Sequence, residues 1–404
     1  MNKNEEQAAF TKLGELNQRR QEEINAAAAT DLPKTYPMNE LVKALHPATQ
    51  YLKVTEIIDH GPDAKSFVFA PDKDKGTTKL ATFQPGQYIS LRLHIGDSYV
   101  TRPYAIRSTP LQAKEGKYVL TMKLVNGGFV TPYIWKNWQV GTTVAASGPA
   151  GELFYEPLRD GKNIVAIAGG SGITPFYSMA QAILENTLDV NLTILYGSRR
   201  HDNILLGDEL QGIAEQTNRV KLVNVLSDEE VPGFEHGFIS KDLIEKYAPA
   251  ADYSIFISGP SVMYQFVMKE VAQLHLAPGR VRHELNGNTA APDQFAGYPA
   301  EAKGKTFSMT VITRDQSKTI PAAANESLLI ALERAGIIAP SMCRSGICSA
   351  CRSQVLDGHT FTPTEFDHRR AADREFGYVN TCVAYPTSDL TLKVPVHDYA
   401  NQFG

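Results

Sequence analysis

The chain has 404 residues, of which 43% are apolar and 21% charged, a globular composition in a chain too long for one ordinary core. We therefore expect two or three domains. The formal net charge of −4 disfavours general binding to nucleic acid or anionic lipid. No stretch has the apolar run of a membrane span or a secretory signal, so we expect a cytoplasmic protein with no membrane span.

Residues 1–46 are expected to form a helical N-terminal extension. Residues 5–29 are rich in Glu, Gln, Asn and Ala, which predicts one solvated helix. Apolar residues then repeat at helical spacing and predict a short second helix packed on another surface: Met38, Leu41, Val42 and Leu45. A surface appendage is the simplest interpretation; the alternative is an element for partner selection or self-association.

Residues 47–157 have the pattern of an antiparallel β-barrel. Short alternating runs are separated by glycine and proline, for example at 66–69, 88–93 and 118–124. Arg102 can bind a flavin phosphate and Tyr104 can lie against a flavin ring. Alone, these residues would more often be ordinary strand and turn. The nucleotide-binding pattern that directly follows them favours the flavin interpretation.

Residues 158–286 have the pattern of an α/β domain with a parallel sheet. A buried strand at 163–168 leads through a glycine loop into a helix at 176–184, as a site for a dinucleotide phosphate requires. The loop residues have separate expected roles: close approach of a pyrophosphate for Gly170 and Gly172, and capping of the helix for Thr174.

A second strand, at 255–260, ends in the turn Ser258-Gly259-Pro260 at the same edge of the predicted sheet. Open parallel sheets bind ligands at this edge, so the two loops together support a nucleotide site better than the glycine turn alone. Arg199 and Arg200 follow the intervening strand and could hold a 2′-phosphate. They could equally be solvated charges, which leaves NADH and NADPH open.

All four cysteines lie in the last part of the chain, after a predicted linker at 287–304. Their spacing, C-x4-C-x2-C followed by one distant cysteine, is that of a plant-type [2Fe–2S] site: Cys343, Cys348, Cys351 and Cys382. A structural zinc site usually needs two C-x2-C pairs, so zinc and free buried cysteines are less favoured. We expect residues 305–404 to form a small α+β, β-grasp-like ferredoxin domain.

From about Tyr51 to Val394 the chain resembles the ferredoxin–NADP reductase superfamily, in the oxygenase-reductase form with a C-terminal plant-type ferredoxin domain. The similarity is carried by the cysteine spacing, the G-G-x-G-I-T-P loop, the S-G-P turn, the R-x-Y-A stretch and a G-x-x-T motif. Three positions depart from the usual pattern: Ala105 replaces a hydroxyl residue, Ser258 a cysteine and Ser349 a glycine.

The resemblance implies roles for named residues. Those expected to bind the flavin, FAD in preference to FMN, are Arg102, Tyr104, Ala105, Gly127, Gly128 and Thr131. Those expected to bind NAD(P)H are Gly170, Gly172, Thr174, Arg199, Gly259 and Pro260. Those expected next to the reacting rings are Tyr104, Thr174 and Ser258. His283 and Glu284 could approach the flavin or form an ordinary pair at the end of a strand.

These motifs predict an NAD(P)H-dependent reductase. A hydride passes from NADH or NADPH to FAD, and single electrons then pass through the [2Fe–2S] cluster to a protein acceptor such as an oxygenase. Two alternatives stay open at this point. One is a redox carrier or sensor that does not turn over NAD(P)H, and the other is a free-standing flavin, quinone or ferric reductase.

Overall fold

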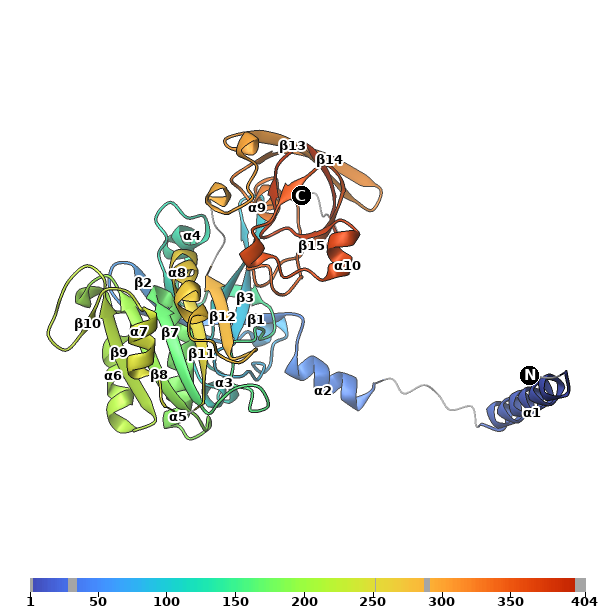
Figure 1. The fold of residues 1–404 in the computed structure, drawn as a ribbon, viewed down its shortest axis with the longest axis horizontal. Helices are drawn as coiled ribbons and strands as arrows, with labels where there is room; N and C mark the ends of the chain where they lie inside the picture. Colours follow the sequence, from blue (N-terminus) through green and yellow to red (C-terminus); the bar gives the residue numbers. More distant parts are fainter. Residues whose placement is uncertain (1–2, 28–34, 251, 287–290, 397–404) are drawn as a thin grey trace. The chain divides into compact units, whose positions relative to one another are not determined.

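We describe a computed structural model in which residues 3–27, 35–250, 252–286 and 291–396 are placed (Figure 1). Its contacts divide the chain into two compact units, Met1–Ala44 and Leu45–Gly404. Among the placed residues, no helix has both the length and the apolar character needed to cross a membrane.

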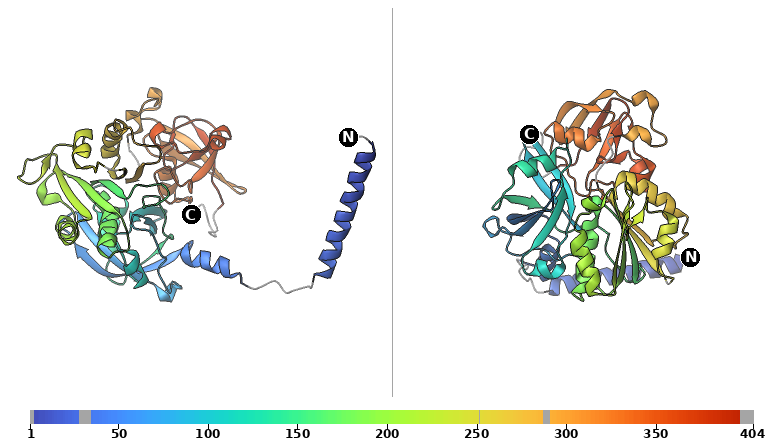
Figure 2. Two further views of the ribbon diagram at one scale, coloured as in Figure 1. Left: turned by 60° about the horizontal axis from the view of Figure 1, so that its bottom comes forward. Right: turned by 90° about the vertical axis from the view of Figure 1, so that its left-hand side faces the viewer.

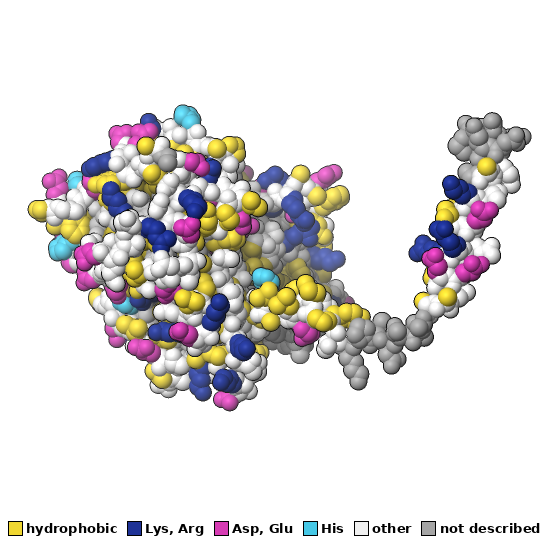
Figure 3. Space-filling model, turned by 90° about the horizontal axis from the view of Figure 1, so that it is seen from below, with side chains coloured by type: hydrophobic (Ala, Val, Ile, Leu, Met, Phe, Trp, Pro, Cys, Tyr) yellow, Lys and Arg dark blue, Asp and Glu magenta, His cyan; other side chains and the backbone are white. Residues whose placement is uncertain are grey.

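The N-terminal extension contains two helices, α1 (Lys3–Ala26) and α2 (Pro37–Leu45). Both helices were predicted. No residue of α2 is buried, and the expected packing of this helix on another surface stays a prediction. Its apolar side chains gather on an exposed face (Figure 3).

The second unit begins with a six-stranded antiparallel sheet in the order β4-β3-β6-β1-β2-β5. Its elements are β1 (Gln50–Asp59), β2 (Ala64–Pro71), β3 (Tyr88–Ile95), β4 (Ser98–Ala105), α3 (Pro110–Lys114), β5 (Tyr118–Lys123), α4 (Val130–Asn137) and β6 (Thr143–Ala146). A bridge between Ile106 and Leu120 joins the two edge strands and closes the sheet on itself. Alternate side chains such as Phe67, Leu91 and Leu120 fill the interior, so the predicted barrel is confirmed.

A parallel six-stranded sheet follows, in the order β10-β9-β8-β7-β11-β12. Its elements are β7 (Asn163–Gly169), α5 (Thr174–Leu184), β8 (Asn191–Ser198), α6 (Gly207–Gln216), β9 (Val220–Leu226), β10 (Glu235–His236), α7 (Lys241–Tyr247), β11 (Tyr253–Pro260), α8 (Ser261–Ala272) and β12 (Val281–Asn286). Helices cover both faces, which is why the central strand β7 is a continuous apolar run.

The cysteines belong to the last fold of the second unit, which contains a five-stranded mixed sheet in the order β14-β13-β19-β15-β17. Its elements are β13 (Thr306–Thr313), β14 (Gln316–Ala323), α9 (Leu328–Arg334), β15 (Arg352–Asp357), β16 (Thr360–Phe361), α10 (Ala371–Glu375), β17 (Tyr378–Asn380), β18 (Tyr385–Pro386) and β19 (Leu390–Lys393). Helix α9 packs on this sheet in the α+β arrangement that was predicted.

Specific contacts join the three sheets. Helix α5 lies between the barrel and the parallel sheet (Figure 2), and Ser178 of α5 donates a hydrogen bond to the carbonyl of Ser108 at 2.7 Å. Ser90 of β3 donates to the carbonyl of Met342, next to the first cysteine, at 3.0 Å. These bonds seat the cysteine loop and the nucleotide domain against the same end of the barrel.

Part of the predicted linker is packed against the ferredoxin fold. Phe295 is buried, and its ring lies 5.4 Å from that of Phe366. Residues 287–290 of the predicted linker and 397–404 of the predicted ferredoxin domain lie outside the described residues. The domain boundaries stay predictions.

Candidate active site at the junction of three domains

One cavity of about 400 Å³ is lined by residues from all three folds. The barrel contributes five of the residues predicted to bind flavin: Arg102, Tyr104, Ala105, Gly128 and Thr131. The parallel sheet contributes Ser171, Thr174, Ser258 and Glu284, and the ferredoxin fold contributes Ile330, Cys343, Arg344 and Ser345. Residues that are up to about 240 positions apart in the sequence therefore face one another across a single space.

The R-x-Y-A stretch forms the end of strand β4, paired with β3 so that Ala105 lies opposite Tyr88. Burial raises the pKa of Tyr104 to about 12, so its hydroxyl stays protonated. Burial also lowers the pKa of Arg102 to about 10, and the guanidinium still carries its charge at neutral pH. The cavity wall thus offers an aromatic ring and a cation, which suits a flavin that bears a phosphate.

The predicted second flavin motif forms the turn before helix α4. Gly127 has φ 72°, a conformation that favours glycine, and a side chain on Gly128 would meet the carbonyl of Val125 at 2.9 Å. The hydroxyl of Thr131 accepts a hydrogen bond from the Val125 amide at 2.9 Å and so fixes the turn. No side chain caps α4, which leaves amides at its N-terminus available to a phosphate.

The glycine loop after β7 continues as a 3₁₀ turn, Gly170–Ile173, into α5. Gly170 has φ 54°, and a side chain on Gly172 would come within 2.2 Å of the Ser258 carbonyl. The prediction that Thr174 caps α5 is wrong. Thr174 is the first helical residue, and its hydroxyl donates to the Ser171 carbonyl at 2.9 Å because the 3₁₀ turn precedes the helix directly.

The second loop packs tightly on the first. A side chain on Gly259 would come within 3.3 Å of the Gly169 amide nitrogen, so the two loops lie in close contact. Ser258 is 1% exposed and lines the cavity, whereas Gly259 and Pro260 do not. The backbone of this turn therefore holds the glycine loop, and only the serine faces the cavity.

The side chains of His283 and Glu284 point to opposite faces of the sheet, because they are neighbours in strand β12. Glu284 lies opposite Ser258 and lines the cavity, where burial, followed by the nearby Cys343, raises its pKa to about 8. The His283 ring instead lies 4.8 Å from Tyr264 and 6.0 Å from His368. Of the two, only Glu284 is placed to meet a flavin.

Arg199 and Arg200 lie away from this cavity and are already paired with acids. The Arg199 Nε atom is 2.9 Å from Asp228 Oδ2, and Arg200 is within 3.5 Å of both Asp202 and Glu229. Both guanidiniums are largely exposed. The end of β8 is therefore a mixed surface with more carboxylates than guanidiniums.

The four cysteines lie in two neighbouring pairs, Cys343 with Cys348 and Cys351 with Cys382. Among the described residues, no three His, Cys, Asp or Glu side chains converge on one metal position. Two cysteines for each of two iron atoms is the arrangement that a [2Fe–2S] cluster requires, and it does not suit a single zinc ion. The donor set fits the cluster.

Backbone amides of the cysteine loop point at the sulfurs. The Cys343 sulfur accepts from the amides of Ser345 and Cys348, each at 3.4 Å, and the Cys348 sulfur accepts from the amide of Ala350 at 3.5 Å. A hydrogen bond from the Cys348 thiol lowers the pKa of the Cys343 thiol. The loop thus stabilises negative sulfur.

The departure at Ser349 has a structural meaning. Its φ is 56°, in the left-handed region where glycine is normally preferred. Arg344, in the same loop, also has φ 56°. The cysteine loop therefore contains two strained non-glycine residues that its surroundings must hold in place.

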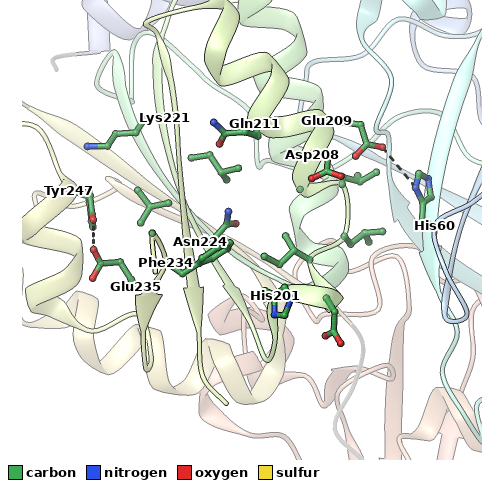
Figure 4. A pocket seen from close by; sticks show the side chains of 18 residues that line it. His60, His201, Asp208, Glu209, Gln211, Lys221, Asn224, Phe234, Glu235 and Tyr247 are labelled. Atoms are coloured by element: carbon green, nitrogen blue, oxygen red, sulfur yellow. Dashed lines mark hydrogen bonds and ion pairs between the residues drawn. The ribbon is translucent and has the colours of Figure 1, made fainter. Parts of the chain in front are cut away.

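A larger hollow, of about 930 Å³, lies on the side of the nucleotide domain (Figure 4). It is lined mostly by α6, β9 and the segment before α7, and none of the predicted site residues borders it. Size alone would favour this hollow. The smaller cavity is the better candidate, because the flavin motif, the nucleotide loops and a cluster cysteine meet there.

Sequence reasoning did not assign Tyr88, Glu333 or Arg344 to the site. Tyr88 lies beside Gly151, where a side chain would meet its ring at 2.8 Å. Arg344 directly follows Cys343 in the cysteine motif, and this position could have indicated that it lies at the site. Glu333 carried no local signal, because its partners belong to the barrel and to the cysteine loop.

Comparisons with known families agree with this three-part organisation. Residues 51–155 match the family described as Oxidoreductase FAD-binding domain, and residues 166–269 match Oxidoreductase NAD-binding domain. Residues 312–387 match the 2Fe-2S iron-sulfur cluster binding domain. The order along the chain is the order predicted from the motifs.

The chain is similar to reductase components of oxygenases along most of its length. It is 26% identical to the ferredoxin reductase component of 3-ketosteroid-9-alpha-monooxygenase from Mycobacterium tuberculosis, over 84% of this chain and 93% of that protein. It is 25% identical to the glycine betaine monooxygenase reductase subunit of Pseudomonas aeruginosa, over 84% and 94%. NADH-cytochrome b5 reductase 1 of Dictyostelium discoideum is 32% identical over 55% of this chain and 78% of that protein.

Among solved structures, phthalate dioxygenase reductase has the same fold. It aligns with 90% of this chain and 100% of its own, at a TM-score of 0.61 and 22% identity.

Proposed function

Because the chain belongs to the ferredoxin–NADP reductase superfamily and carries its own [2Fe–2S] domain, we propose that it delivers electrons from NAD(P)H to a separate oxygenase component. It is an NAD(P)H-dependent oxidoreductase of the ferredoxin reductase type, with FAD-binding, NAD-binding and [2Fe–2S] domains. The observation that carries the proposal is the single cavity shared by the flavin motif, the nucleotide loops and Cys343.

Each wall of the cavity has a proposed task. Arg102 and the amides at the start of α4 would hold the phosphates of a bound flavin, and Tyr104 would contact its ring system. Gly170 and Gly172 let the backbone approach the nicotinamide coenzyme, and Thr174 and Ser258 contact its ring. FAD, when bound, supplies the conversion between two-electron and one-electron chemistry.

Hydride transfer needs orientation and a dry site more than proton transfer. We assign no general acid or base to it. Ser258 and Thr174 are buried, and the tight packing of Gly172 on the Ser258 carbonyl holds both loops at a fixed separation. We propose that this packing sets how the nicotinamide is presented to the flavin.

We infer that NADH is preferred to NADPH. A 2′-phosphate would bring nearly two negative charges to a surface that already holds Asp202, Asp228 and Glu229. Arg199 and Arg200 could bind it only by giving up these partners. A free ribose hydroxyl meets no such repulsion.

An oxygenase as the acceptor is supported by the relatives. Two relatives that align along most of the chain are reductase parts of monooxygenases, and the present chain covers more than nine tenths of each. A cytoplasmic location is consistent with four thiols that must stay reduced to bind a cluster.

The function is tested by asking whether acceptor reduction needs the cluster. We expect Cys382→Ser to abolish electron delivery to a protein acceptor, with cytochrome c as a surrogate, and to leave flavin reduction by NADH intact. Equal cytochrome c reduction by the variant and the natural protein would identify a free-standing flavin reductase and contradict the proposal.

A further inference from the structure

Three charged side chains meet where the barrel touches the ferredoxin domain. Arg102 comes from β4, Glu333 from α9, and Arg344 directly follows Cys343 in the cysteine loop. One oxygen of Glu333, Oε1, lies 3.5 Å from Arg102 Nη1 and accepts a hydrogen bond from Arg344 Nη1. Glu333 is 5% exposed and Arg344 6%. A single carboxylate thus links two domains.

Stability alone is a poor explanation for this trio. Buried charges lose their hydration, and apolar residues of similar size would often hold two surfaces together as well or better. The two guanidiniums also share one carboxylate, so the group has an excess of one positive charge. Both arginines line the cavity beside the flavin motif, which makes a phosphate the natural anion to complete the group.

We propose that Glu333 is a positioning residue that couples flavin binding to the seating of the ferredoxin domain. The inference rests on the proposed function, because it takes the cavity to be the flavin site. Glu333 holds Arg102 against the wall where the flavin phosphate binds. It also holds Arg344, and with it the loop that begins at Cys343.

The surroundings of the trio show why the cysteine loop needs this restraint. Arg344 has φ 56°, a strained conformation that persists only where other contacts impose it. On the other side of Cys343, Ser90 donates to the Met342 carbonyl at 3.0 Å. A side chain on Gly336, just after α9, would meet the Asp97 carbonyl at 3.1 Å. The loop is therefore held from the barrel on one side and by Glu333 on the other.

The test compares the full-length holoprotein with Glu333→Gln, Glu333→Asp and a matched control, Glu326→Gln. Glu326 forms its ion pair with Arg334 inside the ferredoxin domain at 2.7 Å, so the control removes a similar bond without touching the barrel. Two quantities are measured. One is the dissociation constant of FAD, by fluorescence, and the other is the rate at which the cluster is reduced after the flavin, by stopped-flow absorbance.

We expect Glu333→Gln to weaken FAD binding and to slow cluster reduction, each by about tenfold or more, since the shared carboxylate then no longer holds Arg102 at the cavity wall or Arg344 beside Cys343. Glu333→Asp should recover part of both losses, and Glu326→Gln should change neither. Unchanged FAD affinity in Glu333→Gln, or a fall in thermal stability alone, would overturn the coupling.

A second measurement avoids the variants. In the natural protein freed of flavin, FAD should protect the amides of residues 341–345 from hydrogen exchange, whereas riboflavin, which has no phosphate, should not. Equal protection by both ligands, or none by either, would overturn the proposal. The proposed function itself would fail by a different result: NADH would not reduce the flavin of the natural protein.

Discussion

At the residue scale, the site depends on positions where a side chain cannot fit. Gly172 lies so close to the Ser258 carbonyl that a methyl group would come within 2.2 Å of it. Because that carbonyl belongs to the opposite nucleotide loop, the clash would change the separation of the two loops. The effect should be on hydride transfer, since the barrel and the cysteine loop lie outside this contact.

We therefore predict that Gly172→Ala lowers kcat/KM for NADH by about 100-fold while flavin and cluster absorbance stay normal. Gly212→Ala is the matched control, because its added methyl group meets nothing within 4 Å. The measurement is steady-state kinetics with ferricyanide as acceptor. Wild-type kcat/KM in Gly172→Ala would show that the loop contact does not position the coenzyme.

Coenzyme choice is a second residue-scale prediction. Asp228 pairs with Arg199 and Glu229 with Arg200, and hydrogen bonds and these cations keep the pKa of both carboxyls below the usual range. Both are ionised at neutral pH. We expect the natural protein to prefer NADH, and Asp228→Asn combined with Glu229→Gln to raise kcat/KM for NADPH with little change for NADH. A natural preference for NADPH would refute this assignment.

At the scale of elements, neighbouring side chains of strand β12 point to opposite faces of the sheet, and the two faces have different surroundings. Glu284 faces the cavity, while the preceding side chain, His283, packs between Tyr264 of α8 and His368 of the ferredoxin domain. Burial, followed by the nearby His368, lowers the pKa of His283 to about 4. This strand therefore carries a neutral histidine at the contact between two domains.

This pKa shift predicts how stability depends on pH. In the unfolded chain the histidine has a pKa of about 6.5, so between pH 6.5 and 4 the unfolded state binds a proton that the folded state does not. The free energy of unfolding is therefore unaffected by this histidine above pH 6.5. It falls by up to about 3 kcal/mol as the pH falls from 6.5 towards 4. His283→Gln should make the unfolding midpoint less dependent on pH between 7.5 and 5. An equal dependence in both proteins would contradict the buried neutral state.

Much of this element structure could be predicted because it depends on local pattern. Alternating strands, the apolar run of β7 and the helix before the cysteines follow directly from periodicity and the hydrophobic effect. The cap of α5 was missed because a 3₁₀ turn and a helix share the same glycine loop. The role of the extension stays a prediction.

Contacts between domains could not be predicted, because their partners are far apart in the sequence. Glu333 looks like an ordinary residue of an amphipathic helix until Arg102 is seen beside it, more than 200 positions away. The same is true of Ser90 and Met342. In contrast, the four cysteines could be found from spacing alone, since loop length restricts which thiols can share a two-iron cluster.

At the scale of the whole molecule, the three folds set an order of electron flow. The nucleotide loops, the flavin motif and the first cluster cysteine line one cavity, and the cluster loop is the last of these along the path to a protein acceptor. NADH should therefore reduce the flavin first and the cluster through it. A carrier or sensor without NAD(P)H turnover would show neither step.

The most direct test is an anaerobic titration of the holoprotein with NADH, followed by ultraviolet–visible absorbance and repeated with NADPH. We predict that NADH bleaches both the flavin and the [2Fe–2S] bands, and that in Cys382→Ser it bleaches the flavin alone. Flavin bleaching without cluster reduction in the natural protein, or no bleaching with either coenzyme, would contradict the proposed path.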